Sequence, residues 1–224
     1  SSTELSPGLE TPPEDLLQLA AWVFHAPHVQ ANEQYRRVAA RVHFIPDLED
    51  ATVNAFAGLF ELAAGDGAVP CIVFLGGAAR FSRLAALALA LDRHQGEGHR
   101  AERLHLLLDR LGPRVVESRG RLDTSTAADL ARAAGLVGAL GDEVIGRHAR
   151  SIAAGMIISV IAHELGHHAL GHTLGPALNL NISRNQEREA DSFAASVISS
   201  GPFADHLAIG PILWNLMWVW CEYA

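Results

Sequence analysis

Residues 151–172 read SIAAGMIISVIAHELGHHALGH. The first twelve are mostly apolar, which predicts a buried helix that runs directly into an HExxH motif. Residues four positions apart share one face of a helix, so His163 and His167 can direct their rings at the same metal ion. Glu164 projects toward the same side, where its carboxylate could accept a proton from a water on that metal.

A second motif follows at residues 183–195, which read SRNQEREADSFAA. Catalytic zinc usually takes three protein ligands and leaves a fourth position open, and Glu187 is the predicted third ligand. Asp191 lies one helical turn further on and can accept a hydrogen bond from the free ring nitrogen of His163, which would orient that ring. Glu189, two positions after Glu187, is expected to point elsewhere.

The two motifs together resemble the M48 zinc metallopeptidases, the family of the Ste24 and HtpX proteases. The resemblance implies a zincin-like fold with a small β-sheet and an HExxH active-site helix. It also implies that His163, His167 and Glu187 bind zinc and that Glu164 is the general base. These are the residues chosen from spacing alone, and the Asp of the family motif corresponds to Asp191.

A third stretch adds to the resemblance. Residues 52–57 read TVNAFA and look like the N-A-F segment that enters an edge strand in these enzymes. Asn54, Ala55 and Phe56 are therefore expected to border the substrate, which could pair with the strand as an added β-strand. Residues 71–77 look like the next strand and its glycine turn into a helix.

The chain departs from the family in two places. Residues 92–140 read as a helical insertion, which we interpret as a solvated lid. The family's later His or Arg that stabilises the oxyanion has no counterpart in a recognisable motif. The candidates for that role are His172 and His206, with Arg184 and Tyr223 as further options.

Other histidines are less suited to bind the metal. His172 falls one position short of the metzincin ligand spacing, and the glycine before it is one position late. It could instead support the second shell or line the substrate site. His168 faces around the helix and is expected to bind its protein surroundings. The remaining histidines have no ligand-like spacing and are predicted to be surface or lightly buried residues: His25, His28, His43, His94, His99, His105 and His148.

Composition excludes several classes of function. The net charge of −8 disfavours nucleic acid as a partner, since phosphate binding needs a basic face. All 17 basic residues are arginine, which excludes lysine Schiff-base chemistry. Two cysteines, Cys71 and Cys221, are too few for a disulfide framework. The sequence alone is compatible with one disulfide between them. A cytoplasmic location is expected, with peripheral membrane association possible through the tryptophan-rich residues 212–221 but without a transmembrane span.

Periodicity predicts one domain over residues 14–224 after a flexible segment at 1–13. Helices are predicted over 14–25, 31–41, 78–91 and 101–111, from Ser125 or Thr126 to Leu136, over 142–172 with a break near 150, and over 185–199; short strands are predicted over 42–45, 53–60 and 71–75.

The sequence therefore predicts a predominantly helical α+β zinc endopeptidase acting on a peptide or protein. An M78-like protease is the first alternative, although that group typically shows Asn where this chain has Asp191. A relative of the phage-exclusion proteases and a non-catalytic zinc-containing interaction or regulatory domain are the others. The presence of Glu164 argues against the last, because a structural zinc site needs no base.

Overall fold

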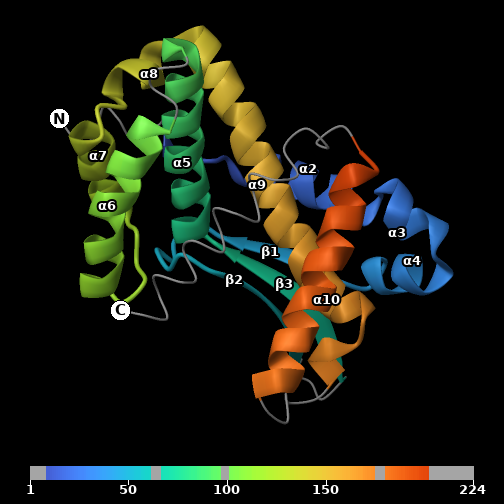
Figure 1. Cartoon of the computed structure of the whole chain (residues 1–224). Coiled ribbons are helices and arrows are strands. Elements are labelled where there is room, and N and C mark those ends of the chain that lie inside the picture. The colour runs from blue at the N-terminus through green and yellow to red at the C-terminus, as the bar shows by residue number, and fades with distance from the viewer. Residues whose placement is uncertain (1–8, 62–66, 97–100, 175–179, 202–224) are drawn as a thin grey trace.

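The computed structural model describes residues 9–61, 67–96, 101–174 and 180–201 (Figure 1). The described chain is α+β and mostly helical, as predicted, with one small sheet. Its helices are α2 (Pro13–Phe24), α3 (Pro27–Ala31), α4 (Glu33–Ala39), α5 (Gly76–Gln95), α6 (Glu102–Glu117), α7 (Thr124–Ala133), α8 (Val137–Gly141), α9 (Glu143–Ala169) and α10 (Leu180–Ser199), with a short 3-10 turn η2 (His172–Leu174) after α9.

The sheet has three strands in the order β1 (His43–Asp47), β3 (Ala68–Leu75) and β2 (Ala55–Glu61). β3 is the central strand; it runs parallel to β1 and antiparallel to β2. Its residues Cys71 to Leu75 are buried without alternation, as expected for a strand covered on both faces. β2 is an edge strand, which agrees with the position predicted for the N-A-F segment.

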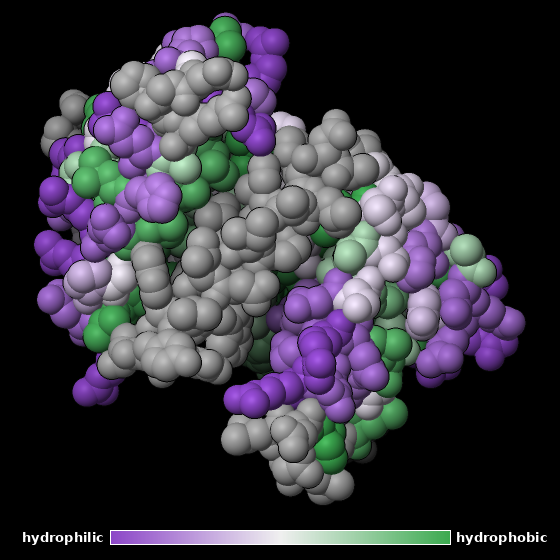
Figure 2. All heavy atoms as spheres, viewed as in Figure 1, coloured by the Kyte–Doolittle hydropathy of each residue, from purple (hydrophilic) through white to green (hydrophobic). Residues whose placement is uncertain are grey.

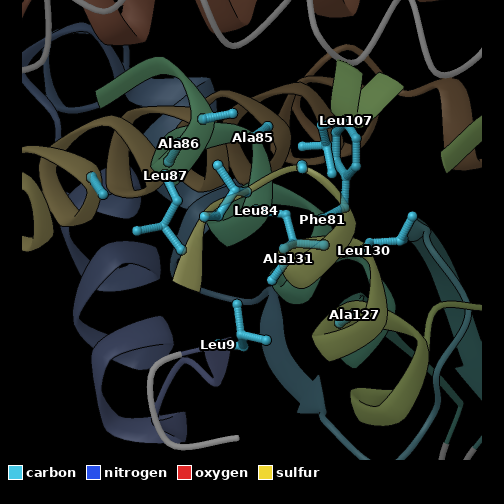
Figure 3. Packing of buried hydrophobic residues seen from close by; sticks show 14 of the residues in the cluster. Leu9, Phe81, Leu84, Ala85, Ala86, Leu87, Leu107, Ala127, Leu130 and Ala131 are labelled. Carbon is cyan, nitrogen blue, oxygen red and sulfur yellow. The ribbon is translucent and has the colours of Figure 1, made fainter. Parts of the chain in front are cut away.

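Two hydrophobic clusters fill the interior, and α9 contributes to both. Its first half packs with α5, α6, α7 and α8, where Figure 3 shows Phe81, Leu84 and Leu87 of α5 against Leu107 and Leu130. Its second half packs with the sheet, α2 and α10. This shared burial explains why the sequence of α9 is apolar on nearly all sides rather than amphipathic.

The insertion at 92–140 forms part of a core, so the prediction of a solvated lid is wrong. Leu104, Leu107, Leu111 and Val115 form an apolar stripe on α6 that is buried against α5 and α7. Figure 1 places α6, α7 and α8 on the side of α5 away from α10.

The loop between α6 and α7 also supports the sheet. Leu122 donates its N–H to the carbonyl of Ala51 (2.7 Å), and Val53 donates its N–H to the carbonyl of Gly120 (2.8 Å). These bonds hold the segment that leads into β2, so the insertion fixes the start of the edge strand.

Several predicted boundaries are wrong for local reasons. α6 does not stop before Pro113 but continues to Glu117; the proline is exposed, so water can satisfy the carbonyl that its missing N–H leaves free, and burial of Val115 favours a further turn. The helix predicted over 31–41 is the shorter α4, and the preceding helix α3 was not predicted. Asn32 separates them, because its side chain accepts hydrogen bonds from the N–H groups of Gln34 and Tyr35 and caps α4.

Helix α9 differs from its prediction as well. α9 is continuous through residue 150 and ends at Ala169, so the expected break is absent, and His172 lies in η2. α10 begins at Leu180, five residues earlier than predicted. The five-residue helix α8 was not predicted at all.

The N-terminal segment is not entirely flexible, which corrects the prediction for residues 9–12. Leu9 is fully buried. The Glu10 carboxylate accepts hydrogen bonds from Arg80 Nε (3.2 Å) and Thr124 Oγ1 (2.7 Å). Arg80 also donates to the carbonyl oxygens of Leu48 and Leu122, so it joins four separate segments.

By length and composition α9 could span a membrane, although the sequence predicted no span. In this structure 67% of its apolar window is buried inside the protein, as in a core helix. The tryptophan-rich residues 212–221 lie outside the described chain. Cys71 is buried and free, and Cys221 also lies outside the described residues.

Asp92, at the end of α5, should contribute measurably to stability. Its buried carboxylate accepts hydrogen bonds from the N–H groups of Arg103 (2.9 and 3.1 Å) and Leu104 (3.2 Å), and so caps α6 from a neighbouring helix. Asp92→Ala is expected to lower the free energy of unfolding by about 1–2 kcal/mol, measured by urea denaturation. Asp92→Asn keeps one acceptor and should lose less; an alanine variant as stable as the parent would contradict this role.

Candidate metal centre

Three side chains from two adjacent helices converge on one point. The Nε2 atoms of His163 and His167, both on α9, are 3.0 Å apart. Glu187 on α10 places Oε2 3.1 Å from His163 Nε2 and Oε1 3.6 Å from His167 Nε2. These three residues form a group that could hold a metal ion, and the two helices lie side by side along this region (Figure 1).

The distances fit a zinc ion. Ligand atoms about 2.0–2.1 Å from zinc and arranged tetrahedrally lie about 3.3 Å from one another. The two Nε2 atoms are 3.0 Å apart, and the two oxygens of Glu187 lie 3.1 Å and 3.6 Å from His163 and His167 respectively. Two imidazoles and one carboxylate are also a common ligand set for catalytic zinc. The residues present therefore fit the ion that the sequence predicts.

The ring of His163 is held from behind by Asp191. Its Nδ1 lies 2.9 Å from Asp191 Oδ1, which is the contact expected from the sequence. Because a carboxylate only accepts hydrogen bonds, Nδ1 must carry the proton, and in the neutral ring Nε2 then offers its lone pair to a metal. In that tautomer the Nε2 lone pair of His163 faces the carboxylate of Glu187, and a cation between them would bind both.

The proximity of these side chains shifts the pKa values of His163 and Glu187 in opposite directions. Burial opposes protonation of His163, yet hydrogen bonds to Asp191 and Glu187 and the nearby Glu164 raise its pKa to about 10. Hydrogen bonds from His163 and His167 hold the pKa of Glu187 far below its usual range. Both shifts have the same cause, which is the attraction between a protonated His163 ring and the Glu187 carboxylate.

His167 is held from behind by a second histidine. Its Nδ1 lies 3.1 Å from Nδ1 of His172, and His172 Nε2 lies 3.0 Å from Glu189 Oε2. Gly171 turns the chain back after α9 and brings His172 to this position. The ring of His172 thus lies on the side of His167 away from Nε2, which does not favour its predicted role at the oxyanion.

Glu164 lies between the metal ligands and the sheet. Desolvation raises the pKa of its carboxyl to about 7, although the positive charges of His163 and His167 pull it down. The backbone N–H of Ala57 on β2 lies near this carboxyl and also lowers its pKa. A carboxyl with a pKa near neutrality beside a metal centre is suited to accept and return a proton.

The hydrogen-bond pattern of the sheet explains why the N–H of Ala57 points toward Glu164 rather than toward β3. The N–H of Leu75 donates to the carbonyl of Asn54 (3.1 Å), so these two residues form a hydrogen-bonded pair of the antiparallel ladder. Hydrogen-bonded pairs alternate along such a ladder. The N–H and C=O groups of Ala55, Ala57 and Leu59 therefore point away from β3, toward the edge that pairs with no other strand of the described residues.

Close packing sets the spacing of the two metal-binding helices. A Cβ at Gly166 would lie 3.2 Å from the Cα of Ala190 and from the ring of Phe193. A glycine between the two histidines thus lets α10 approach α9 closely enough for Glu187 to reach both rings. Phe193 also packs edge-on against His28 and Tyr35, which anchors α10 to the N-terminal helices.

His168 has a structural role, as its helical position suggested. Its Nε2 lies 3.0 Å from the carbonyl oxygen of Cys71, and its Nδ1 lies 3.1 Å from Thr173 Oγ1. Burial lowers the pKa of its ring, so a neutral imidazole joins the end of α9 to the central strand.

The structure brings together five of the predicted residues, namely His163, Glu164, His167, Glu187 and Asp191. Arg184 is exposed on α10, where hydrophilic side chains cover the surface seen in Figure 2. His206 and Tyr223 lie outside the described residues. Sequence reasoning missed Glu189 as the partner of His172 and the Ala57 N–H as the partner of Glu164. The one sequence signal for the contact of Glu189 with His172 is the extra histidine five positions after His167, together with the extra glutamate between Glu187 and Asp191.

Comparisons of this chain with protein-family models, with curated proteins and with solved structures found no match. The arrangement of the site thus stands on its own geometry.

Proposed function

We propose that this chain is a zinc-dependent endopeptidase in which Glu164 is the general base and His163, His167 and Glu187 hold the metal. The observation that carries the proposal is the position of Glu164 between a three-ligand centre and the free edge of β2. A structural zinc site needs four protein ligands and no base. Among the described residues, three candidate ligands and an adjacent carboxyl occur together.

Each residue has a distinct part in the reaction. When bound, zinc would supply Lewis acidity, polarising the scissile carbonyl and lowering the pKa of a water molecule. Glu164 would accept the proton of the attacking water as its oxygen adds to the scissile carbonyl carbon, and would return that proton to the amine nitrogen as the C–N bond breaks. The outward N–H and C=O groups of Ala55 and Leu59 can pair with an extended peptide, since strand addition needs an unpaired edge. This pairing reads the backbone of the substrate and orients its scissile bond.

The first test is metal content. Purified protein is expected to contain about one zinc ion per chain. Glu187→Ala should weaken zinc binding, because it removes both the negative charge of a ligand and one of the three coordinating groups. Elemental analysis and competition with a chelator measure both. Glu61→Ala, which removes an exposed carboxylate from β2, is a control. Zinc binding that is absent, or indifferent to Glu187, would instead favour an interaction domain without this centre.

A further inference from the structure

The two histidines of the metal centre are supported in different ways. His163 contacts a carboxylate directly, whereas His167 reaches one only through a second imidazole. The side chain of this imidazole, His172, is 8% exposed, while its partner Glu189 is 63% exposed. The intermediate ring is thus held inside the protein with a hydrogen-bond partner at each of its two nitrogens.

The direction of these hydrogen bonds follows from the carboxylate. Glu189 can only accept, so the proton of a neutral His172 ring lies on Nε2. His172 Nδ1 is then an acceptor, and His167 must donate to it from its own Nδ1. This leaves the lone pair of His167 on Nε2, the atom that lies 3.0 Å from His163 Nε2 at the metal position.

We propose that His172 and Glu189 are positioning residues that fix the tautomer and orientation of His167 for metal binding. The inference rests on the proposed metal centre and deepens it. Hydrogen-bond partners behind a ligating histidine commonly change metal affinity by about 10–100-fold. The same geometry removes His172 from the oxyanion, because its ring is behind the ligand rather than beside the substrate edge.

The test measures zinc affinity on the full chain rather than activity. Protein stripped with a chelator is titrated with Zn²⁺ in competition with a chromophoric chelator. His172→Leu removes both hydrogen bonds at similar volume, and His172→Gln retains one acceptor and one donor group. Glu189→Gln removes only the charge. Glu49→Gln, an exposed carboxylate between β1 and β2, is the matched control.

We expect His172→Leu to raise the zinc dissociation constant by about 10–100-fold, Glu189→Gln to raise it less, and Glu49→Gln to leave it unchanged. His172→Gln should recover part of the affinity lost in the leucine variant. The visible spectrum of the Co²⁺-loaded leucine variant should also change, because the geometry around the metal is disturbed. The thermal midpoint of the metal-free variants reports any damage to folding.

Zinc affinities within twofold of the parent in both His172→Leu and Glu189→Gln would overturn the inference. So would a loss of affinity without recovery in His172→Gln and with a lowered midpoint of every metal-free variant, since that pattern indicates a structural role only. Failure of the parent to bind zinc would overturn this inference together with the proposed function. The expected affinities in a protein that cleaves no peptide would support the inference and count against the proposed function alone.

Discussion

Glu164→Gln is expected to abolish peptide hydrolysis while leaving zinc bound. Loss of a general base typically lowers rates by about 10²–10⁴-fold. Glutamine has nearly the volume of glutamate and keeps an oxygen that can face the Ala57 N–H, so β2 and α9 should keep their contact. Because none of the three predicted ligands changes, zinc content should equal that of the parent protein. Cleavage of an unstructured protein substrate and elemental analysis measure the two results.

The control for this variant is Glu143→Gln. It lies in the first turn of the same helix, is exposed, and pairs only with Arg147 on the surface, so its activity should match that of the parent. Peptide hydrolysis that survives in Glu164→Gln would show that Glu164 is not the base. Loss of zinc from this variant would show that the carboxylate belongs to the metal ligands instead.

Gly77→Ala is expected to prevent folding or to lower the free energy of unfolding by more than about 4 kcal/mol, the range of severe backbone and packing collisions. Gly77 lies at the start of α5, and its N–H donates to the carbonyl of Asp50 (3.2 Å). A Cβ there would come within 2.5 Å of the carbonyl carbon and oxygen of Thr52. Neither backbone can move freely, because the segment at 51–53 is also bonded to the loop after α6.

Gly138→Ala provides the comparison. This glycine lies in α8, and no heavy atom would lie within 4 Å of an added Cβ. It should be neutral or stabilise the protein by about 0.5–1 kcal/mol, since alanine favours a helix over glycine. Soluble yield and urea denaturation distinguish the two variants. A Gly77→Ala protein that is as stable as Gly138→Ala would mean that the segment at 51–53 can shift.

Local spacing predicted the parts of the site that depend on one helix or on two facing helices. The four-residue interval of His163 and His167 places both on one face whatever surrounds them. Glu187 and Asp191 have the same interval on α10, and the structure brings each to the ring expected of it. The mostly helical fold with a small sheet was predictable for the same reason, since periodicity is a local property.

The rest depends on tertiary contacts that no spacing records. Glu189 reaches His172 only because the chain turns back after α9, and the Ala57 N–H reaches Glu164 only because β2 is an edge strand in one particular register. The balanced charges of residues 92–132 indicated a solvated segment, but the leucine stripe of α6 is buried against α5 and α7. Pro113 was read as a stop signal, although its exposed position makes its missing hydrogen bond inexpensive.

The sharing of α9 between two cores bears on any effort to shorten this protein. Successive side chains of a helix differ in direction by about 100°. The directions of His163 and His167 therefore depend on the rotation of α9 about its own axis. Ile145, Ile152 and Met156 set it from within the cluster built with α6, α7 and α8. A minimal fragment made of the sheet, α9 and α10 would contain every metal ligand. It would nevertheless expose those side chains to water and remove one of the two hydrophobic clusters that hold α9 in its orientation.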